Sequence, residues 1–237
     1  MKVFVAGATG VLGRALVPLL LERGHAVVAL ARSPEKAARL ADLGAEPAPG
    51  DLLDPALPLS GLLRGCQAAV HAATAIPADP AAPGAWEATA RLRTEGTRRL
   101  LEAAGEAGVR RYLQQGIALA YADGGERQLD ESAPLDDSPA RAAIVAPVLE
   151  MEALVRRARL EWCLLRAGRF VGRGTFQEAL VDRIRAGTET VPGQGRSFTP
   201  LVHAEDVAQA FALALERAPA GSVYNVAAEP LRLGEYL

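Results

Sequence analysis

The chain has 237 residues, of which 50% are hydrophobic and 23% are charged, and its formal net charge is -2. Such a near-neutral chain gives no electrostatic reason to expect a nucleic acid or an anionic membrane as its partner. No apolar run reaches the roughly 20 residues that a membrane span needs, and the N-terminus begins a strand instead of a signal peptide. We therefore expect a cytoplasmic protein that buries one sizeable core.

The first fourteen residues, MKVFVAGATGVLGR, predict a strand, a glycine-rich turn and a helix. Residues 3–6 form the short apolar run typical of a parallel strand covered on both faces. Gly7, Gly10 and Gly13 follow with G-x-x-G-x-x-G spacing. The first permits a tight turn, the second lets the backbone approach a pyrophosphate, and the third lets the helix pack on the strand.

This turn is predicted to bind the diphosphate of a dinucleotide, because the free N–H groups at the start of the helix face it. A glycine-rich turn without a ligand is the alternative interpretation. The cofactor-binding residues predicted here are Gly7, Thr9, Gly10, Val11, Leu12 and Gly13.

The second predicted strand, residues 25–31, ends where cofactor choice is usually made. In dinucleotide folds an acidic side chain at this place accepts from the ribose 2′-OH, whereas an arginine accommodates a 2′-phosphate. Here Ala31 and Arg32 occupy the turn, and Ser33-Pro34 open a helix that runs to about residue 43. The missing acid favours NADP and leaves NAD open. The alternative for Arg32 is a solvated surface position.

Two further strand ends add candidate cofactor contacts. A short strand near residues 45–48 leads to Asp51 and Leu52, where the carboxylate could accept from an adenine amino group or simply form a turn. The fourth strand, residues 68–71, runs into small residues that let a flat ligand lie close. These are Ala72, Ala73 and Thr74.

The second half of the chain predicts more helices and strands around an acidic loop at residues 123–137, which is either a lid or a solvated loop. Cys66 and Cys163 lie apart, without ligand spacing, so we expect buried thiols and no metal site. The predicted helices are 86–107, 141–159, 176–185 and one that carries Val207, Phe211 and Leu215. The predicted strands are 109–115, 161–165 and 223–226, and glycines 168, 172 and 174 are expected to form a flexible connection.

Seven segments in this order resemble the extended and atypical short-chain dehydrogenase/reductases, often called NAD-dependent epimerase/dehydratases. They are GATGVLG, GDLLD, VHAAT, EGTRRLLEAAGEAGVRRYL, LEWCLLRAGRFVG, FTPLVHAEDVAQA and VYNVA. The resemblance implies an α/β, Rossmann-type doubly wound parallel sheet of order 3-2-1-4-5-6-7. It divides the chain into a dinucleotide-binding body, residues 1–166, and a mixed region, residues 167–237, that includes a small substrate-binding part.

The resemblance also implies features outside the cofactor site. Relatives often form homodimers through the helices that correspond here to residues 86–107 and 141–159. Similar proteins usually begin another helix where this chain ends, at Leu237, so we expect either an unusually short protein or a truncated one.

Members of this group use a tyrosine with a lysine four residues on, helped by a serine and usually an asparagine. The only lysines here are Lys2 and Lys36, so no such pair exists. Aligned on the acidic helix position Glu152, Ile144 and Val148 replace the tyrosine and the lysine. Ile117 replaces the serine, and Arg93 replaces the asparagine.

Tyr121 is the best remaining proton donor, with Arg93 or Arg141 as a source of positive charge. The alternative is a packed tyrosine whose hydroxyl meets a backbone carbonyl. Two functions stay open. One is an NADP-preferring epimerase/dehydratase-like oxidoreductase that acts on a small carbonyl or nucleotide-sugar-like substrate. The other is a catalytically silent NADP(H)-binding sensor or scaffold.

Overall fold

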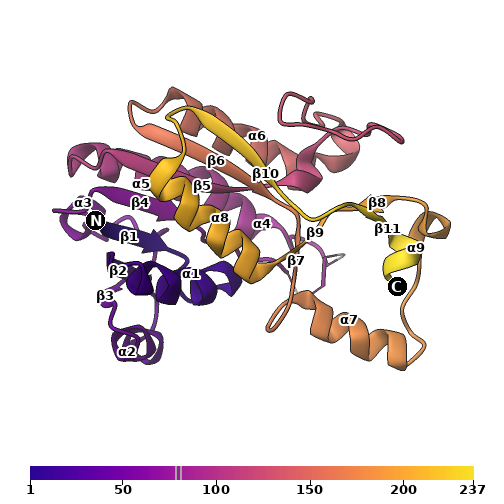
Figure 1. Cartoon of the computed structure of the whole chain (residues 1–237), viewed down its shortest axis with the longest axis horizontal. Coiled ribbons are helices and arrows are strands. Elements are labelled where there is room, and N and C mark those ends of the chain that lie inside the picture. The colour runs from indigo at the N-terminus through magenta and orange to yellow at the C-terminus, as the bar shows by residue number, and fades with distance from the viewer. Residues whose placement is uncertain (78, 81) are drawn as a thin grey trace.

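The protein is a three-layer α/β structure around one parallel sheet (Figure 1). Its computed structural model describes residues 1–77, 79–80 and 82–237. Within these residues, seven parallel strands pair in the order β10-β6-β5-β4-β1-β2-β3. The strands are β1 (Lys2–Ala6), β2 (Ala26–Ala31), β3 (Glu46–Pro49), β4 (Ala68–His71), β5 (Arg111–Ile117), β6 (Glu161–Ala167) and β10 (Ser222–Val226).

This order confirms the predicted Rossmann-type sheet, with β10 as its seventh strand. The chain builds β1, β2 and β3 outward in one direction and then returns to place β4 on the other side of β1. The order therefore reverses between β1 and β4. In open parallel sheets, ligands bind in the crevice at the carboxyl ends of the strands at such a reversal.

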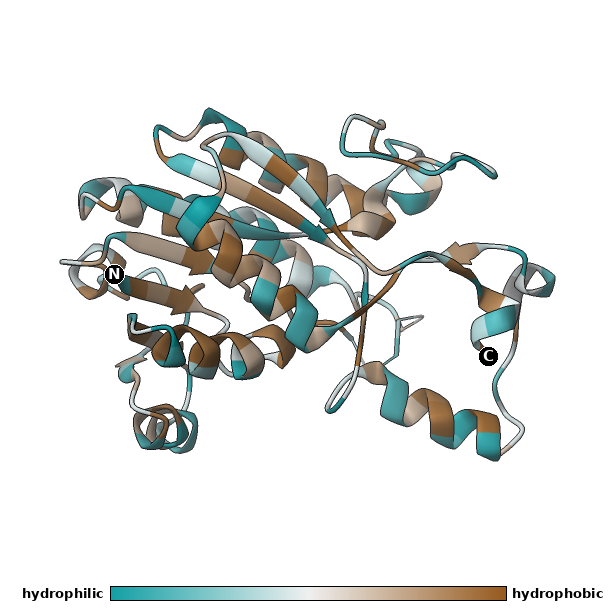
Figure 2. Ribbon diagram, viewed as in Figure 1, coloured by the Kyte–Doolittle hydropathy of each residue, from teal (hydrophilic) through white to brown (hydrophobic). Residues whose placement is uncertain are grey.

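Helices cover both faces of the sheet and enclose two apolar cores. Val3 and Val5 of β1 pack with α1 (Val11–Glu22), α2 (Pro34–Asp42) and α8 (Ala204–Arg217). Phe4 faces the opposite layer, which contains α3 (Leu59–Leu62), α5 (Thr97–Glu106) and α6 (Ala142–Arg157). Because β1 is covered on both sides, its residues are apolar without alternation. Figure 2 shows these strands as hydrophobic ribbons between helices with polar outer faces.

The predicted helix at residues 86–107 is interrupted by a wide turn. It forms α4 (Glu87–Arg91), a π-helical turn η1 (Leu92–Gly96) and α5. The carbonyl of Leu92 hydrogen-bonds His71 Nε2 at 3.1 Å. A side chain on Gly96 would come within 3.1 Å of Leu52. The turn therefore packs directly on the carboxyl end of β4.

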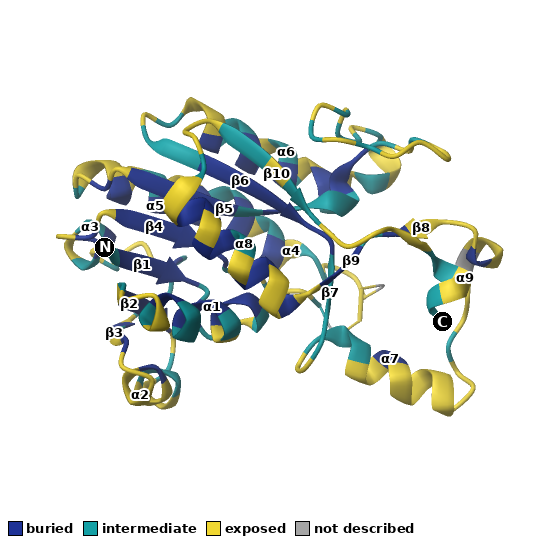
Figure 3. Ribbon diagram, viewed as in Figure 1, coloured by how far each residue is buried: buried dark blue, intermediate teal, exposed yellow. Residues whose placement is uncertain are grey.

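A smaller region extends from the carboxyl end of the sheet (Figure 1). Here β7 (Arg169–Val171) pairs with β9 (Leu201–His203), and β8 (Phe198–Thr199) pairs with β11 (Leu231–Arg232). The flexible connection expected at glycines 168–174 is thus wrong in part, because three of these residues form β7. The smaller region also contains the helices α7 (Phe176–Arg185) and α9 (Leu233–Tyr236). Figure 3 shows that most of α7 is exposed.

Cys66 and Cys163 are buried free thiols, as expected. Among the described residues, no group of histidine, cysteine and acidic side chains is arranged to hold a metal ion. No helix within the described residues combines the length and the apolarity that a bilayer crossing demands.

Candidate functional site

The glycine-rich turn lies at the reversal point, against the end of β4. Gly7 has a φ of +90°, in the left-handed region, and a side chain there would come within 2.5 Å of the Ala72 and Ala73 backbone. A side chain on Gly13 would overlap the backbone of Gly7 and Ala8. A side chain on Gly10, in contrast, would come near only one atom, Gly7 O at 3.3 Å. Gly10 therefore faces away from the protein. Two of the glycines thus bring the turn close to residues 72 and 73, and the third leaves it open.

The start of α1 has the features of an anion site. Gly10 caps the helix in an extended conformation without a side-chain hydrogen bond, and the first turn holds no acidic residue. Unpaired N–H groups and the positive end of the helix dipole favour a negative group here. Leu12 is 2% exposed, so only its backbone can contact a ligand. Arg14 lies next to Gly174, which brings the loop after β7 over this end of the helix.

The corner after β2 carries positive charge. Arg32 is exposed and makes no ion pair with the residues that the structure describes. Ser33 Oγ accepts from Lys36 N at 3.3 Å and caps α2, so a hydroxyl and a lysine lie on the same turn. Arg32 is the residue that the sequence predicts here, whereas Ser33 and Lys36 carry no local signal that marks them as cofactor contacts.

The remaining predicted cofactor contacts, which include Asp51 and Thr74, lie at the ends of β3 and β4. Asp51 Oδ1 accepts from Leu53 N at 2.9 Å and so forms a turn, and its contact with an adenine amino group stays a prediction. Leu52 is buried with 2% exposure, whereas Thr74 is exposed. Ala72 N donates to Ala6 O at 2.8 Å, which fixes the end of β4 beside the glycine turn.

The helix face where the resemblance expects a tyrosine and a lysine is packed with apolar side chains. Val148 is fully buried and belongs to a small cluster. Ile144 and Ile117 are partly buried against it. The cluster's buried members are Ala120, Val145, Val148 and Met151. These positions cannot transfer a proton.

Tyr121 instead lies in a buried polar network. It is 8% exposed, its hydroxyl donates to Asn225 Oδ1 at 2.7 Å, and Arg166 Nη1 donates to the same hydroxyl at 2.7 Å. The Arg166 guanidinium also lies over the tyrosine ring, 4.9 Å from its centre. The hydroxyl therefore meets side chains and not the backbone carbonyl of the alternative interpretation. Arg141 donates to the backbone carbonyl of Tyr121 at 3.1 Å and does not contact the tyrosine hydroxyl.

Glu152 holds Arg166 in place. Arg166 Nε and Nη2 donate to the two oxygens of Glu152, each at 2.8 Å, and both side chains are almost fully buried. Burial alone would lower the pKa of Arg166, but hydrogen bonds to Glu152 and Tyr121 raise the pKa above its ordinary value. Arg166 is therefore a permanent cation beside the phenol. The signal in the sequence is an arginine inside an otherwise apolar strand.

The acidic loop is attached to the same network through Glu131. Its backbone carbonyl accepts from Arg166 Nη1 at 3.2 Å, and its carboxylate accepts from Asn225 N at 2.6 Å. Asp136 of the loop also pairs with Arg141, the residue just before α6, at 3.1 Å. The loop is thus held to the end of the sheet beside Tyr121.

Three more charged or titratable side chains belong to elements at the carboxyl end of the sheet. Arg93 is 5% exposed, and burial lowers its pKa to about 10. Burial lowers the pKa of His71 to about 4, against a smaller opposing effect of its hydrogen bond to Leu92. His203 caps α8 by accepting from Glu205 N at 3.3 Å. Neither histidine hydrogen-bonds Tyr121.

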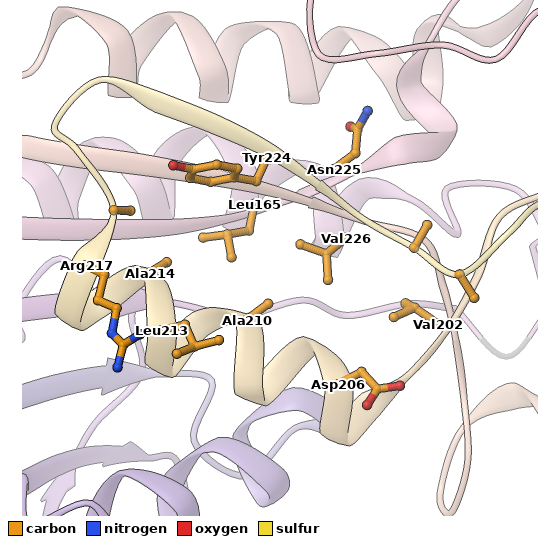
Figure 4. A pocket seen from close by; sticks show the side chains of 13 residues that line it. Leu165, Val202, Asp206, Ala210, Leu213, Ala214, Arg217, Tyr224, Asn225 and Val226 are labelled. Atoms are coloured by element: carbon orange, nitrogen blue, oxygen red, sulfur yellow. The ribbon is translucent and has the colours of Figure 1, made fainter.

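A separate apolar groove of about 530 Å³ lies between α8 and β10 (Figure 4). Tyr224 and Val226 point into it, whereas Asn225 on the same strand turns the other way (Figure 4). Asp206 lies at one end and Arg217 at the other. None of its lining residues belongs to the glycine turn, so the groove is distinct from the candidate cofactor site.

The fold and the glycine-rich turn at the sheet reversal are those of a dinucleotide-binding α/β protein. The sequence model of the NAD dependent epimerase/dehydratase family matches residues 3–227, and the chain belongs to that family. It is 39% identical over 247 aligned residues to 3-diazoavenalumate denitrifying reductase from Streptomyces sp. That alignment covers 100% of this chain and 79% of the relative.

Two other relatives are similar over the whole chain. A 4-hydroxy-2-methyl-3-oxo-4-farnesyl-3,4-dihydroquinoline-1-oxide ketoreductase from Stigmatella aurantiaca is 33% identical, with 100% of this chain and 71% of the relative covered. The solved structure of MoeE5 in complex with UDP-glucuronic acid and NAD superposes with a TM-score of 0.83 at 26% identity. It matches 100% of this chain and 80% of the MoeE5 chain.

Proposed function

We propose that the protein is an NADP-preferring reductase of small carbonyl compounds. The observation that carries this proposal is the open glycine turn at the sheet reversal, where Gly10 leaves the start of α1 free for a diphosphate. Residues 72 and 73 would lie against the cofactor on the β4 side. When bound, the cofactor supplies the hydride equivalent.

A carbonyl substrate is favoured over a nucleotide sugar by the relatives. The relative at 33% identity is named as a ketoreductase, which acts on a carbonyl group, whereas the relative at 39% identity is named as a reductase of a diazo compound. The nucleotide-sugar complex is more distant, at 26% identity. An epimerase or dehydratase activity on a nucleotide sugar is therefore less well supported than the reduction of a carbonyl compound.

NADP is favoured over NAD by the charge after β2. Arg32 has no ion-pair partner among the described residues, and Ser33 and Lys36 lie on the same turn. A 2′-phosphate brings two negative charges and several acceptor oxygens, which such donors bind well. The nearest acidic side chain in sequence, Glu35, already pairs with Arg39 at 2.5 Å.

Tyr121 is the proposed proton donor to the carbonyl oxygen. Its proton lies on the bond to Asn225 in the structure, so it must turn toward the substrate to donate. Arg166 at 2.7 Å then stabilises the phenolate left behind, because an opposite charge at this distance favours the charged form. In this role Arg166 takes the place of the lysine that the chain lacks.

Calorimetry with NADPH and NADH tests the cofactor proposal. We expect NADPH to bind at least about 10-fold more tightly, and Arg32→Asp to abolish or reverse the preference because an acid accepts from the ribose 2′-OH. Arg39→Asp on the same helix is the control, since Arg39 is exposed and already paired. Failure to bind either dinucleotide contradicts the whole proposal.

Oxidation of NADPH with a panel of aldehydes and ketones tests turnover. With an accepted substrate, Tyr121→Phe should lower kcat about 100-fold or more, in line with the loss of a general acid. Unchanged turnover in this variant would rule out Tyr121 as the donor.

A catalytically silent NADP(H)-binding sensor or scaffold is the second candidate. It is favoured by the apolar packing of Val148 and Ile144, and by the fact that both contacts of the Tyr121 hydroxyl are internal. Tight binding of NADPH without oxidation across the carbonyl panel would select this function.

A further inference from the structure

Arg93 is a buried cation that has no anionic partner among the residues that the structure describes. It is 5% exposed, and its one hydrogen bond to a described residue joins Nη1 to the carbonyl of Ile144 at 3.3 Å. Within the described residues no carboxylate lies in ion-pair reach of it. The other buried arginines differ, since Arg166 pairs with Glu152 at 2.8 Å and Arg111 pairs with Glu161 at 3.7 Å.

Such a residue is unfavourable for the unliganded protein. Removing a guanidinium from water is strongly unfavourable unless opposite charge and hydrogen bonds replace the water. One long bond to a neutral carbonyl offsets little of this loss. Burial also lowers the pKa of Arg93 to about 10, which still leaves the group charged at neutral pH. The buried charge of Arg93 would be compensated if a bound ligand supplied the opposite charge.

The contacts of Arg93 and its neighbour Leu92 place it between the end of β4 and the start of α6. It belongs to η1, whose Leu92 carbonyl bonds His71 at the carboxyl end of β4. On the other side its guanidinium reaches the first turn of α6, at Ile144. The residue after His71 is Ala72, which meets the glycine turn. Arg93 thus stands between the cofactor turn and the apolar cluster of α6.

We propose that Arg93 binds a carboxylate on the substrate, and that the substrate class is carbonyl compounds that carry a carboxylate. This proposal rests on the reductase function given above. A guanidinium presents paired N–H donors that match a carboxylate. Ile144, which Arg93 contacts, and Ile117 pack against the same cluster and offer an apolar wall for the body of the molecule. The cofactor diphosphate would be held elsewhere, at the start of α1.

The test compares acids with their neutral amides. Pyruvate, levulinate and 4-formylbenzoate, each beside its primary amide, are titrated into the protein by calorimetry, with and without saturating NADPH. We expect at least one acid to bind 10-fold or more tightly than its amide. Arg93→Met should abolish this preference, and Arg93→Lys should keep part of it. Arg98→Met is the control, since Arg98 is an exposed α5 residue whose loss changes net charge equally.

Thermal melting separates a binding role from a structural one. Without ligand, Arg93→Met should melt at the same temperature as the wild type or higher, because it removes an uncompensated charge. A structural arginine would instead lower the melting temperature on removal. If this variant does not fold, Arg93 is structural and the proposal is wrong.

The outcomes for the two proposals are distinguishable. Equal affinity for every acid and amide, no binding of any acid, or a preference that persists in Arg93→Met overturns the role of Arg93. Each of these results leaves NADPH binding and turnover of neutral carbonyls intact. Conversely, a wild type that prefers acids but binds no dinucleotide contradicts the reductase and not the anion site.

Discussion

The bond between Glu152 and Arg166 shows how single side chains set up the site. Both groups are nearly inaccessible to solvent, and two parallel hydrogen bonds of 2.8 Å join them. The remaining donors of Arg166 reach Tyr121 and the Glu131 carbonyl. Arg156 adds a second cation to Glu152 at 3.2 Å. Each charge is therefore compensated, which a buried pair requires.

Removing one charge of this pair should be strongly destabilising. Glu152→Gln leaves Arg166 buried beside a neutral group, so we expect the free energy of unfolding to fall by about 3 kcal/mol or more. Replacing both residues, in Glu152→Leu with Arg166→Met, should restore part of that loss because no unpaired charge remains. Urea denaturation measures Glu152→Gln, the double variant and its two single variants, Glu152→Leu and Arg166→Met. Glu150→Gln, an exposed change on the same helix, is the control. A double variant as unstable as the sum of both single variants would contradict the pairing.

At the scale of an element, the glycine turn separates folding from binding. Gly13 packs α1 on the turn, because a side chain there would overlap the backbone of Gly7. Gly10 sits at the same turn but faces outward. The two glycines therefore serve different purposes, although the sequence spacing presents them alike.

Alanine at Gly13 should lower mainly the stability of the fold, whereas alanine at Gly10 should weaken mainly the binding of NADPH. Gly13→Ala forces the helix away from the strand, and we expect it to lower the free energy of unfolding by about 1–3 kcal/mol. Gly10→Ala needs only a small adjustment of a 3.3 Å contact, so stability should change little. It should nevertheless weaken NADPH binding about 10-fold or more, because the methyl group occupies the path to the diphosphate. Thermal melting and calorimetry distinguish the two. Unimpaired binding by folded Gly10→Ala would contradict the assignment of the turn.

The acidic loop is a second element with a specific attachment. Glu131→Ala removes the acceptor of Asn225 N, and we expect this amide to exchange its hydrogen about 10-fold faster, which corresponds to about 1.4 kcal/mol. Hydrogen exchange measured by NMR gives this rate directly. Asp137→Ala, an exposed change in the same loop, should leave it unaltered. Equal exchange in both variants would show that the carboxylate does not hold the loop.

At the scale of the molecule, local sequence patterns predicted most of the sheet. The strand 68–71 and the helix 176–185 match β4 and α7 at both ends, because each has a clear apolar pattern and a clear boundary. The pairing of β7 with β9 was not predicted. Strands of three residues beside glycines carry too little local pattern, and they form only because a distant partner is present.

The candidate site was predictable where it depends on short-range spacing. The glycine turn and the loss of polar groups at Ile144 and Val148 are visible in the sequence. The network around Tyr121 is not, because Arg166 and Asn225 come from β6 and β10, and periodicity does not say which polar groups will meet. Arg93 was predicted as the replacement of an asparagine, but only the structure shows that no counter-charge lies beside it among the described residues.

The stability of the whole molecule should depend on His71 in acid. Its pKa falls from the ordinary 6.5 to about 4 in the folded protein, mainly because the ring is buried. Between these values the unfolded chain takes up a proton that the folded protein does not, so the free energy of unfolding falls as the pH falls. The loss should reach about 3 kcal/mol near pH 4. Urea denaturation from pH 7.5 to pH 4.5 measures it. His71→Gln should flatten this part of the profile, and His203→Gln, which changes an exposed ring, should not. A His71→Gln profile parallel to the wild type would mean that carboxylates alone cause the acid loss.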